Sequence, residues 1–209
     1  MARCDASFRD TVVDRCLAAL VSAGFKRLRK NSVYWPIRDG FYCWVGLNQG
    51  LYSNYLYIEP FVGVHVEPIA RLYSKLDKGK YAIKYDRGVA TYSVHLGELS
   101  GASDEPKFLF EPQHSEKFIN DEAGRLAQLY IKFGLPFAES IASYEALLPM
   151  LQERLPMLNG YPQRVASCLY LMGRIDAARE FVEGFLSENR EVFEGFAIPF
   201  LAMVRSERI

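Results

Sequence analysis

The sequence has few histidines, and it lacks the common catalytic motifs. It contains three histidines in 209 residues. The G-x-S-x-G nucleophile motif, the glycine-rich phosphate loop, the H-E-x-x-H zinc motif and the dinucleotide-binding fingerprint do not occur. We therefore expect no catalytic residue, no metal site and no cofactor. A metal or acid–base site built from His65, Glu59 and Glu67 is the least favoured alternative.

Long apolar runs and closely spaced cysteines are also missing. No stretch of about 18 uncharged apolar residues occurs, so no membrane span is expected. The first ten residues, MARCDASFRD, lack the apolar core of a secretion signal. Cys4, Cys16, Cys43 and Cys168 lie far apart and form no C-x-x-C pair, which favours free thiols in a reducing cytoplasm. We expect a cytoplasmic protein in which Cys16 and Cys43, on apolar faces, are buried and inert.

A net charge is absent as well. The 25 basic residues balance the 25 acidic ones, so no global field attracts nucleic acid or an anionic membrane. The charges are unevenly distributed along the chain. Residues 1–100 hold 14 Lys+Arg against 9 Asp+Glu, and residues 101–209 hold 11 against 16. This asymmetry suggests a basic half and an acidic half that attract each other.

A clear two-residue alternation occupies residues 54–66, NYLYIEPFVGVHV. Alternate side chains of a strand point to opposite faces of a sheet. One face is aliphatic, and the other carries aromatic rings, a carboxylate and an imidazole. The aliphatic set predicts a buried sheet face formed by Leu56, Ile58, Pro60, Val62, Val64 and Val66.

The other segments predict one helix before the strands and several helices after them. Apolar residues at helical spacing over 8–21 predict a helix capped by Ser7 and ended by Gly24. Two strand-like segments follow, and the DRG turn at 86–88 indicates a hairpin between KYAIKY and VATYSVHL. We predict an α+β fold, in which an antiparallel sheet carries a covering N-terminal helix and a C-terminal helical bundle follows. The predicted boundaries are a sheet domain over 1–100, a linker over 101–113 and the bundle over 114–209.

The aromatic set of the central strand has two interpretations. It forms a second core under the C-terminal helices, or it forms a surface that binds a protein partner. Tyrosine hydroxyls need water or hydrogen-bond partners, and tyrosine and tryptophan are frequent anchors of protein interfaces. The predicted partner-binding residues are Tyr42, Trp44, Tyr55, Tyr57 and Glu59.

A short basic segment next to aromatic residues raises the alternative of a small-molecule or single-stranded nucleic-acid site. Basic side chains beside stacking rings on a sheet are typical of proteins that bind single strands. Four cations in a neutral chain make a small footprint, and no RNP-type motif occurs, so a solvated turn is the favoured interpretation. The residues of this alternative patch are Lys26, Arg27, Arg29, Lys30 and Tyr34.

Residues 20–72 contain the short motifs Gly24-Phe25-Lys26, Tyr34-Trp35, Asn48-Gln49 and Val62-Gly63-Val64. These motifs resemble a bacterial family catalogued as domain of unknown function 4304. Such domains are similar in style to cytoplasmic immunity proteins, which neutralise the toxins of competing bacteria. The resemblance therefore implies a non-enzymatic protein that binds a toxin through a complementary surface.

Overall fold

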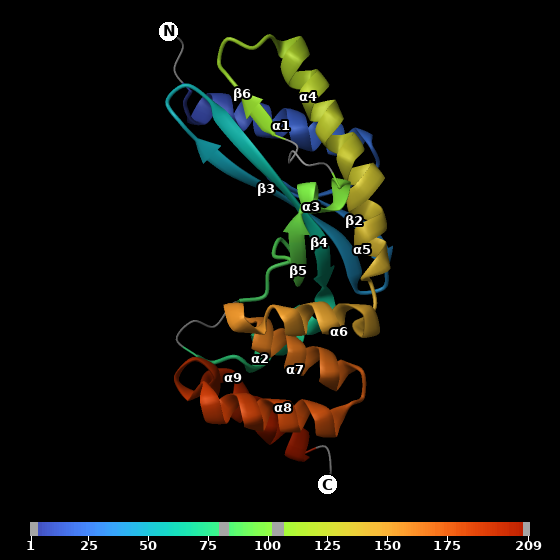
Figure 1. Ribbon diagram of the computed structural model, residues 1–209, viewed down its shortest axis with the longest axis vertical. Coiled ribbons are helices and arrows are strands. Elements are labelled where there is room, and N and C mark those ends of the chain that lie inside the picture. Colours follow the sequence, from blue (N-terminus) through green and yellow to red (C-terminus); the bar gives the residue numbers. More distant parts are fainter. Residues whose placement is uncertain (1–3, 80–83, 102–106, 207–209) are drawn as a thin grey trace. The chain divides into compact units, whose positions relative to one another are not determined.

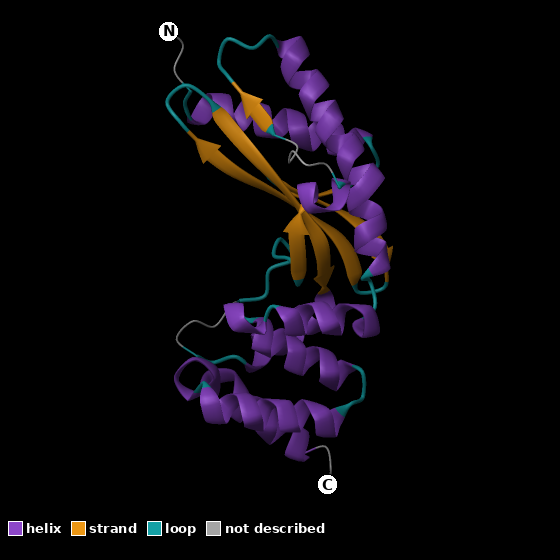
Figure 2. Cartoon of the chain, viewed as in Figure 1, coloured by secondary structure: helices purple, strands orange, loops and turns teal. Residues whose placement is uncertain are grey.

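The strands form one antiparallel sheet, and the predicted α+β class is confirmed (Figure 2). The computed structural model describes residues 4–79, 84–101 and 107–206. Five strands follow the order β1-β2-β3-β4-β5, and a sixth, β6, pairs antiparallel with the start of β4. The strands are β1 (Lys26–Arg29), β2 (Ser32–Arg38), β3 (Phe41–Leu51), β4 (Leu56–Val66), β5 (Tyr92–His95) and β6 (Phe108–Phe110).

Helices precede, interrupt and follow the strands (Figure 1). Two short segments differ from the α-helices, because η1 is a π-helix and η2 a 3-10 helix. Among the described residues, none of the helices combines the length and the apolar character that crossing a membrane requires. The helices are α1 (Ala6–Ser22), α2 (Glu67–Leu76), α3 (Leu96–Ser100), α4 (Glu116–Leu129), η1 (Tyr130–Gly134), α5 (Leu135–Ser140), α6 (Tyr144–Glu153), η2 (Leu155–Met157), α7 (Tyr161–Leu171), α8 (Ile175–Glu188) and α9 (Arg190–Ser206).

The chain divides into two compact units at other places than the sequence predicts. The first unit comprises residues 1–64 and 93–140, and the second comprises 65–92 and 141–209. The predicted linker over 101–113 contains β6, and its residues 102–106 lie outside the described residues. The prediction missed β6 because its strand signal rests on only two residues, Phe108 and Phe110, both of which are fully buried.

The predicted charge asymmetry does not follow the two units. The first unit holds 12 Lys+Arg against 13 Asp+Glu, and the second holds 13 against 12. Each unit is therefore close to neutral. The expectation that a basic half attracts an acidic half was wrong, because α4 and α5 bring acidic residues to the sheet unit, and α2 with the segment after it brings basic residues to the helical unit.

The aliphatic face of the sheet is buried under a layer of helices in the first unit, as predicted. Leu56, Ile58 and Val62 are inaccessible to solvent. The ring of Phe108, opposite Ile58 in the register of β4 and β6, lies 4.1 Å from the guanidinium of Arg125 on α4. Helix α1 packs against both α4 and β2, and α5 packs against β3. The helical layer therefore contains α4 and α5 as well as the predicted N-terminal helix.

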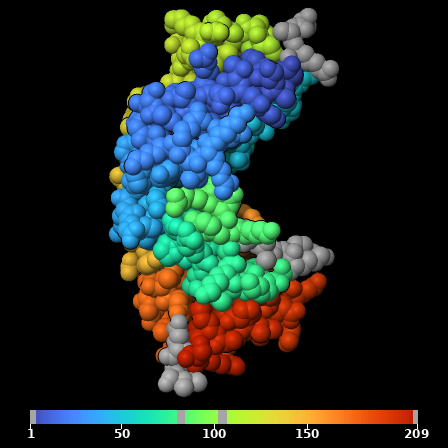
Figure 3. All heavy atoms as spheres, turned by 180° about the vertical axis from the view of Figure 1, so that it is seen from behind, coloured from blue at the N-terminus to red at the C-terminus, as the bar shows by residue number. Residues whose placement is uncertain are grey.

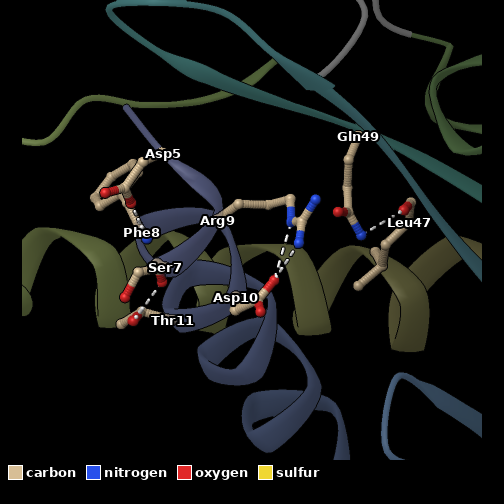
Figure 4. A network of polar contacts seen from close by, with 8 residues as sticks. All are labelled: Asp5, Ser7, Phe8, Arg9, Asp10, Thr11, Leu47 and Gln49. Atoms are coloured by element: carbon tan, nitrogen blue, oxygen red, sulfur yellow. Dashed lines mark hydrogen bonds and ion pairs between the residues drawn. The ribbon is translucent and has the colours of Figure 1, made fainter. Parts of the chain in front are cut away.

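The first helix begins two residues earlier than a Ser7 cap requires. Asp5 is the N-cap, and its Oδ1 accepts a hydrogen bond of 2.9 Å from the backbone N–H of Phe8 (Figure 4). Ser7 lies inside the helix, where its carbonyl accepts from the Thr11 hydroxyl at 3.0 Å. Aspartate is as good a cap as serine, and the prediction of Ser7 as the cap was wrong.

In the second unit, α9 passes so close to the segment after α2 that only glycine fits at the crossing. Pro199 has no N–H, so the carbonyl of Gly195, four residues earlier, lacks its partner within the helix. That carbonyl accepts a hydrogen bond of 2.9 Å from the backbone N–H of Lys78. A Cβ atom at Gly195 would lie 2.3 Å from the Cα of Gly79. Figure 3 shows the green spheres of α2 against the red spheres of α9, and the two helices are in contact.

The hairpin predicted around the DRG turn can be followed only in part. Residues 80–83 of its first strand lie outside the described residues. The turn itself is present, because Asp86 Oδ1 accepts from the N–H of Gly88 at 2.7 Å. Of the second predicted strand, β5 covers Tyr92–His95, and it pairs with β4.

Candidate functional site

The second face of the sheet is lined by aromatic rings from three neighbouring strands. In the register of β2 and β3, Tyr34 lies opposite Trp44 and Pro36 lies opposite Tyr42, so these residues share one face. A Cβ atom on Gly46 would contact both Trp44 and Phe61, which places Phe61 of β4 on that same face. Tyr57 and Glu59 follow by the alternation of β4. We call this surface the aromatic face, and its members are Tyr34, Tyr42, Trp44, Tyr57, Glu59 and Phe61.

Trp44 lies over Gly46, where the sheet surface has no side chain. A Cβ atom at position 46 would lie 2.3 Å from Cη2 of Trp44 and 3.2 Å from Cβ of Phe61. On the opposite side of the sheet, the buried Tyr130 hydroxyl lies 2.9 Å from the Gly46 carbonyl oxygen and 3.0 Å from that of Phe61. The centre of the aromatic face is therefore supported from below by a polar contact that joins β3 to β4.

The rings of the aromatic face are half-buried. Tyr34 and Tyr42 meet edge to face, with ring centroids 5.5 Å apart. All six members have intermediate exposure, in contrast to the aliphatic side chains of β4. Leu109 of β6, which lies opposite Tyr57, is 39% exposed and extends the apolar surface. The face thus combines fixed aromatic rings with accessible edges.

Tyr55, one of the predicted binding residues, lies beside the aromatic face. It precedes the first residue of β4 and belongs to the turn after β3. Its ring stacks on that of Tyr52 at 4.5 Å between centroids, and its carbonyl accepts from the Tyr52 N–H at 2.9 Å. Tyr52 is 51% exposed. The alternation predicted over 54–66 began two residues too early, because β4 begins at Leu56.

The structure divides the basic patch between the two faces of β1. Lys26 lies opposite Tyr34 and shares the aromatic face with it. Arg27 lies opposite the buried Val33, and together with Lys30 it lines a shallow hollow against Asp14 and Arg15 of α1. Arg29 lies beyond an irregularity in the register. The four cations and Tyr34 therefore do not form one continuous surface on which a single strand could stack.

Two of the three histidines act as local caps. His95 Nδ1 accepts from the Gly97 N–H at 3.1 Å, and Glu98 Oε1 accepts from the His95 N–H, which together form a capping box at α3. His114 Nδ1 accepts from the Glu111 N–H at 3.1 Å. These contacts give both imidazoles a structural role at the start of a helix or in a loop.

His65, Glu59 and Glu67 do not form the site that was considered as an alternative. His65 is buried, and its Nδ1–H donates to the Val89 carbonyl at 2.7 Å. Glu67 forms ion pairs with Arg71 and Arg87 at 2.6 and 2.9 Å. Within residues 4–79, 84–101 and 107–206, no three His, Cys, Asp or Glu side chains are arranged to hold a metal ion.

The burial of His65 predicts a pH-dependent stability. Desolvation lowers its pKa below the ordinary value of 6.5, although the Val89 carbonyl and Glu67 oppose this shift. Between the two pKa values the unfolded chain binds a proton that the folded protein does not bind. The free energy of unfolding should therefore fall as the pH is lowered from 7 toward 5. In His65→Gln, which cannot be protonated, urea unfolding should show a smaller pH slope. An identical slope in both proteins would contradict this assignment.

The four cysteines are free, as expected, and the expected burial of Cys16 and Cys43 extends to Cys4 and Cys168. Burial raises the pKa of the Cys16, Cys43 and Cys168 thiols to about 12. These three thiols are therefore protonated at neutral pH, and only the thiolate is a good nucleophile. They act as small apolar side chains in the core.

The second unit contains a pocket that the sequence analysis missed. Its volume is about 720 Å³, within the range of small-molecule sites. The walls come from the segment after α2, the loop before α7, the last part of α8 and the start of α9. The loop before α7 contains the Asn159-Gly160 pair. In the structure Leu158, Asn159 and Gly160 have positive φ angles of 57°, 30° and 80°. Asn-Gly marks a turn in a sequence, but it does not show that a pocket lies beside the turn.

Among the residues that carry the resemblance, Gly24, Phe25 and Trp35 have structural roles in this fold. The Gly24 backbone has a φ of +108°, and a Cβ atom there would lie 2.7 Å from the Trp35 ring. Phe25 packs edge to face on Trp35, with ring centroids 5.4 Å apart.

No family model, no curated protein and no solved structure matches this chain.

Proposed function

We propose that this chain is a non-enzymatic protein that binds a protein partner through the aromatic face. The observation that supports the proposal is the set of half-buried rings on a rigid sheet, supported from below by Tyr130. Tyrosine and tryptophan bury a large area at little cost in side-chain entropy, and their polar groups hydrogen-bond at the edge of a contact. A core of the same size has no need of three tyrosine hydroxyls.

The composition of the face favours a partner surface with aliphatic and basic side chains. Glu59 is a carboxylate between the rings of Tyr57 and Phe61 along β4. Arginine can pair with a carboxylate and stack on aromatic rings at the same time. Lys26 near Tyr34 adds a positive edge, so orientation would be set by a carboxylate at one place and a cation at another.

The specific form of the proposal is a bacterial immunity protein that neutralises a toxin. It is supported by the resemblance of residues 20–72 to a family similar in style to immunity proteins. Inhibition by surface complementarity requires a preformed docking surface and no catalytic group. The half-buried rings of the aromatic face, held on neighbouring strands, support its assignment as this surface.

Substitutions on the aromatic face test this proposal. The partner is first identified by mass spectrometry of proteins that copurify with the untagged chain from its native cells. Trp44→Ala and Tyr57→Ala should then each weaken the purified complex by about 1–4 kcal/mol in calorimetry, because anchors in an interface lose contact area and hydrogen bonds. Phe118→Ala on α4, an aromatic residue that is 39% exposed away from this face, serves as the control and should leave the affinity unchanged.

Two outcomes would refute the aromatic face as a docking surface. One is an unchanged affinity in a folded Trp44→Ala/Tyr57→Ala double variant. The other is a double variant that unfolds before it loses the partner, which would identify the face as core. Binding of a fluorescent oligothymidine with strong salt dependence would favour the nucleic-acid alternative instead. The division of the basic residues over two faces of β1 argues against that result.

A further inference from the structure

The pocket in the second unit combines an apolar wall with a surplus of hydrogen-bond acceptors. We propose that it binds a small organic cation, a primary amine on an aromatic or aliphatic body. The pocket belongs to the helical unit, and the proposal does not depend on the aromatic face.

Asp77 presents a half-buried carboxylate that accepts hydrogen bonds from two neutral groups of the described residues. Its Oδ1 accepts from the backbone N–H of Gly79 at 2.9 Å, and its Oδ2 accepts from Nε2 of Gln163 at 3.5 Å. Within the described part of the chain, no cation forms an ion pair with Asp77. A half-buried carboxylate without a cationic partner favours a positively charged ligand.

Gln163 adds an acceptor that lacks a donor. Because a carboxylate can only accept, the amide must direct Nε2 toward Asp77, and this fixes Oε1 as the remaining acceptor. Oε1 is shielded from solvent and has no hydrogen-bond partner among the described residues. A buried acceptor without a donor is costly, so a ligand with several N–H groups would relieve it after a small rotation of the amide.

The start of α9 makes the pocket more acidic. Glu191 and Glu194 line it together with Asp77, whereas Lys78 is the lysine among the lining residues. Glu194 is partly neutralised by Arg190, at 3.2 Å. Glu191 is exposed and has no ion pair with a described residue. A cation is therefore attracted to this pocket, and an anion is repelled.

The apolar wall fits the body of such a ligand. Tyr73 and Phe193 are buried, and the ring of Phe193 meets that of Phe185 at 4.9 Å between centroids. Leu158 and Val192, which are 37% and 50% exposed, also line the pocket. Leu158 has a φ of 57°, an unfavourable conformation for a bulky residue that is often found beside binding sites. Aromatic walls also attract an ammonium group directly.

The test compares benzylamine with two molecules of the same shape, benzyl alcohol and benzoate. Each is titrated to millimolar concentration into the ¹⁵N-labelled full chain. Benzylamine should shift the amide resonances of Leu158, Gln163 and Val192 and should bind more tightly than either analogue. Asp77→Asn, which keeps the shape and the acceptor for Gly79, should weaken binding roughly tenfold. Glu191→Gln should weaken it about two- to fivefold.

Glu180→Gln, on α8 and outside the pocket lining, is the matched control and should bind benzylamine as the unmodified chain does. The proposal is overturned if benzylamine causes no shift, if benzoate or benzyl alcohol binds equally well, or if Asp77→Asn binds with unchanged affinity. A negative result would leave the partner-binding proposal standing, since its variants lie in the other unit.

Discussion

Val62→Asp should lower the free energy of unfolding of the sheet unit by about 3–5 kcal/mol, because it places an unpaired carboxylate in the core. Val62 is inaccessible to solvent. Its Cγ2 would lie 3.0 Å from a Cβ atom at Gly134, so no space for water remains on that side. Both tryptophans, Trp35 and Trp44, belong to the sheet unit. Tryptophan fluorescence during urea unfolding therefore measures this unit directly.

Leu109→Asp is the matched control for the buried charge. Leu109 belongs to the same sheet, but it lies on the opposite face and is 39% exposed. A carboxylate there stays hydrated, so the change should be within about 1 kcal/mol. Equal destabilisation by the two substitutions would show that the two faces of the sheet have been assigned incorrectly.

Gly195→Ala should destabilise the helical unit by about 2–4 kcal/mol, through a collision between two backbones. The added Cβ would lie 2.3 Å from Gly79 Cα and 2.4 Å from Gly79 N. Neither atom can move aside as the end of a side chain can. The hydrogen bond from Lys78 N–H to the Gly195 carbonyl would lengthen or break. Thermal unfolding followed by circular dichroism, together with faster hydrogen exchange at the Lys78 amide, would measure the effect.

Gly184→Ala, on α8, provides the comparison. A Cβ atom there meets nothing within 4 Å. The substitution should stabilise the unit by about 0.5–1 kcal/mol, because alanine loses less backbone entropy than glycine in a helix. The two variants make the same chemical change in neighbouring helices, so effects of the same sign would refute the close crossing of α9 with Gly79.

The strongest sequence patterns predicted the fold correctly. The alternation at 56–66 gave the buried face of β4, and the helical spacing at 8–21 gave α1. Both rely on local periodicity, which directly reflects burial on one side of an element. The aromatic face also follows from this alternation, since Tyr57 and Glu59 alternate along β4 with the buried Ile58 and Pro60.

The features that the sequence did not predict depend on contacts between distant residues. β6 is three residues long, and its pairing with β4 joins positions about fifty residues apart. The placement of Lys26 and Arg27 on opposite faces of β1 depends on the register of β1 with β2. The pocket depends on Asp77 and Gln163, which are 86 positions apart. Local periodicity shows which side of a segment is buried, but it does not show which distant segment packs against that side.

Each unit consists of two separate segments of the chain, and this determines the order in which the units can fold during synthesis. During synthesis, residues 1–64 emerge before β6 and α4, which must follow before the apolar sheet face is covered. Residues 65–92 are synthesised between these two segments, and their own partners, residues 141–209, come later. The sheet unit can therefore be completed before the helical unit. A cut at residue 100 would divide both units between the two fragments, whereas removal of 65–92 together with 141–209 would leave both segments of the sheet unit.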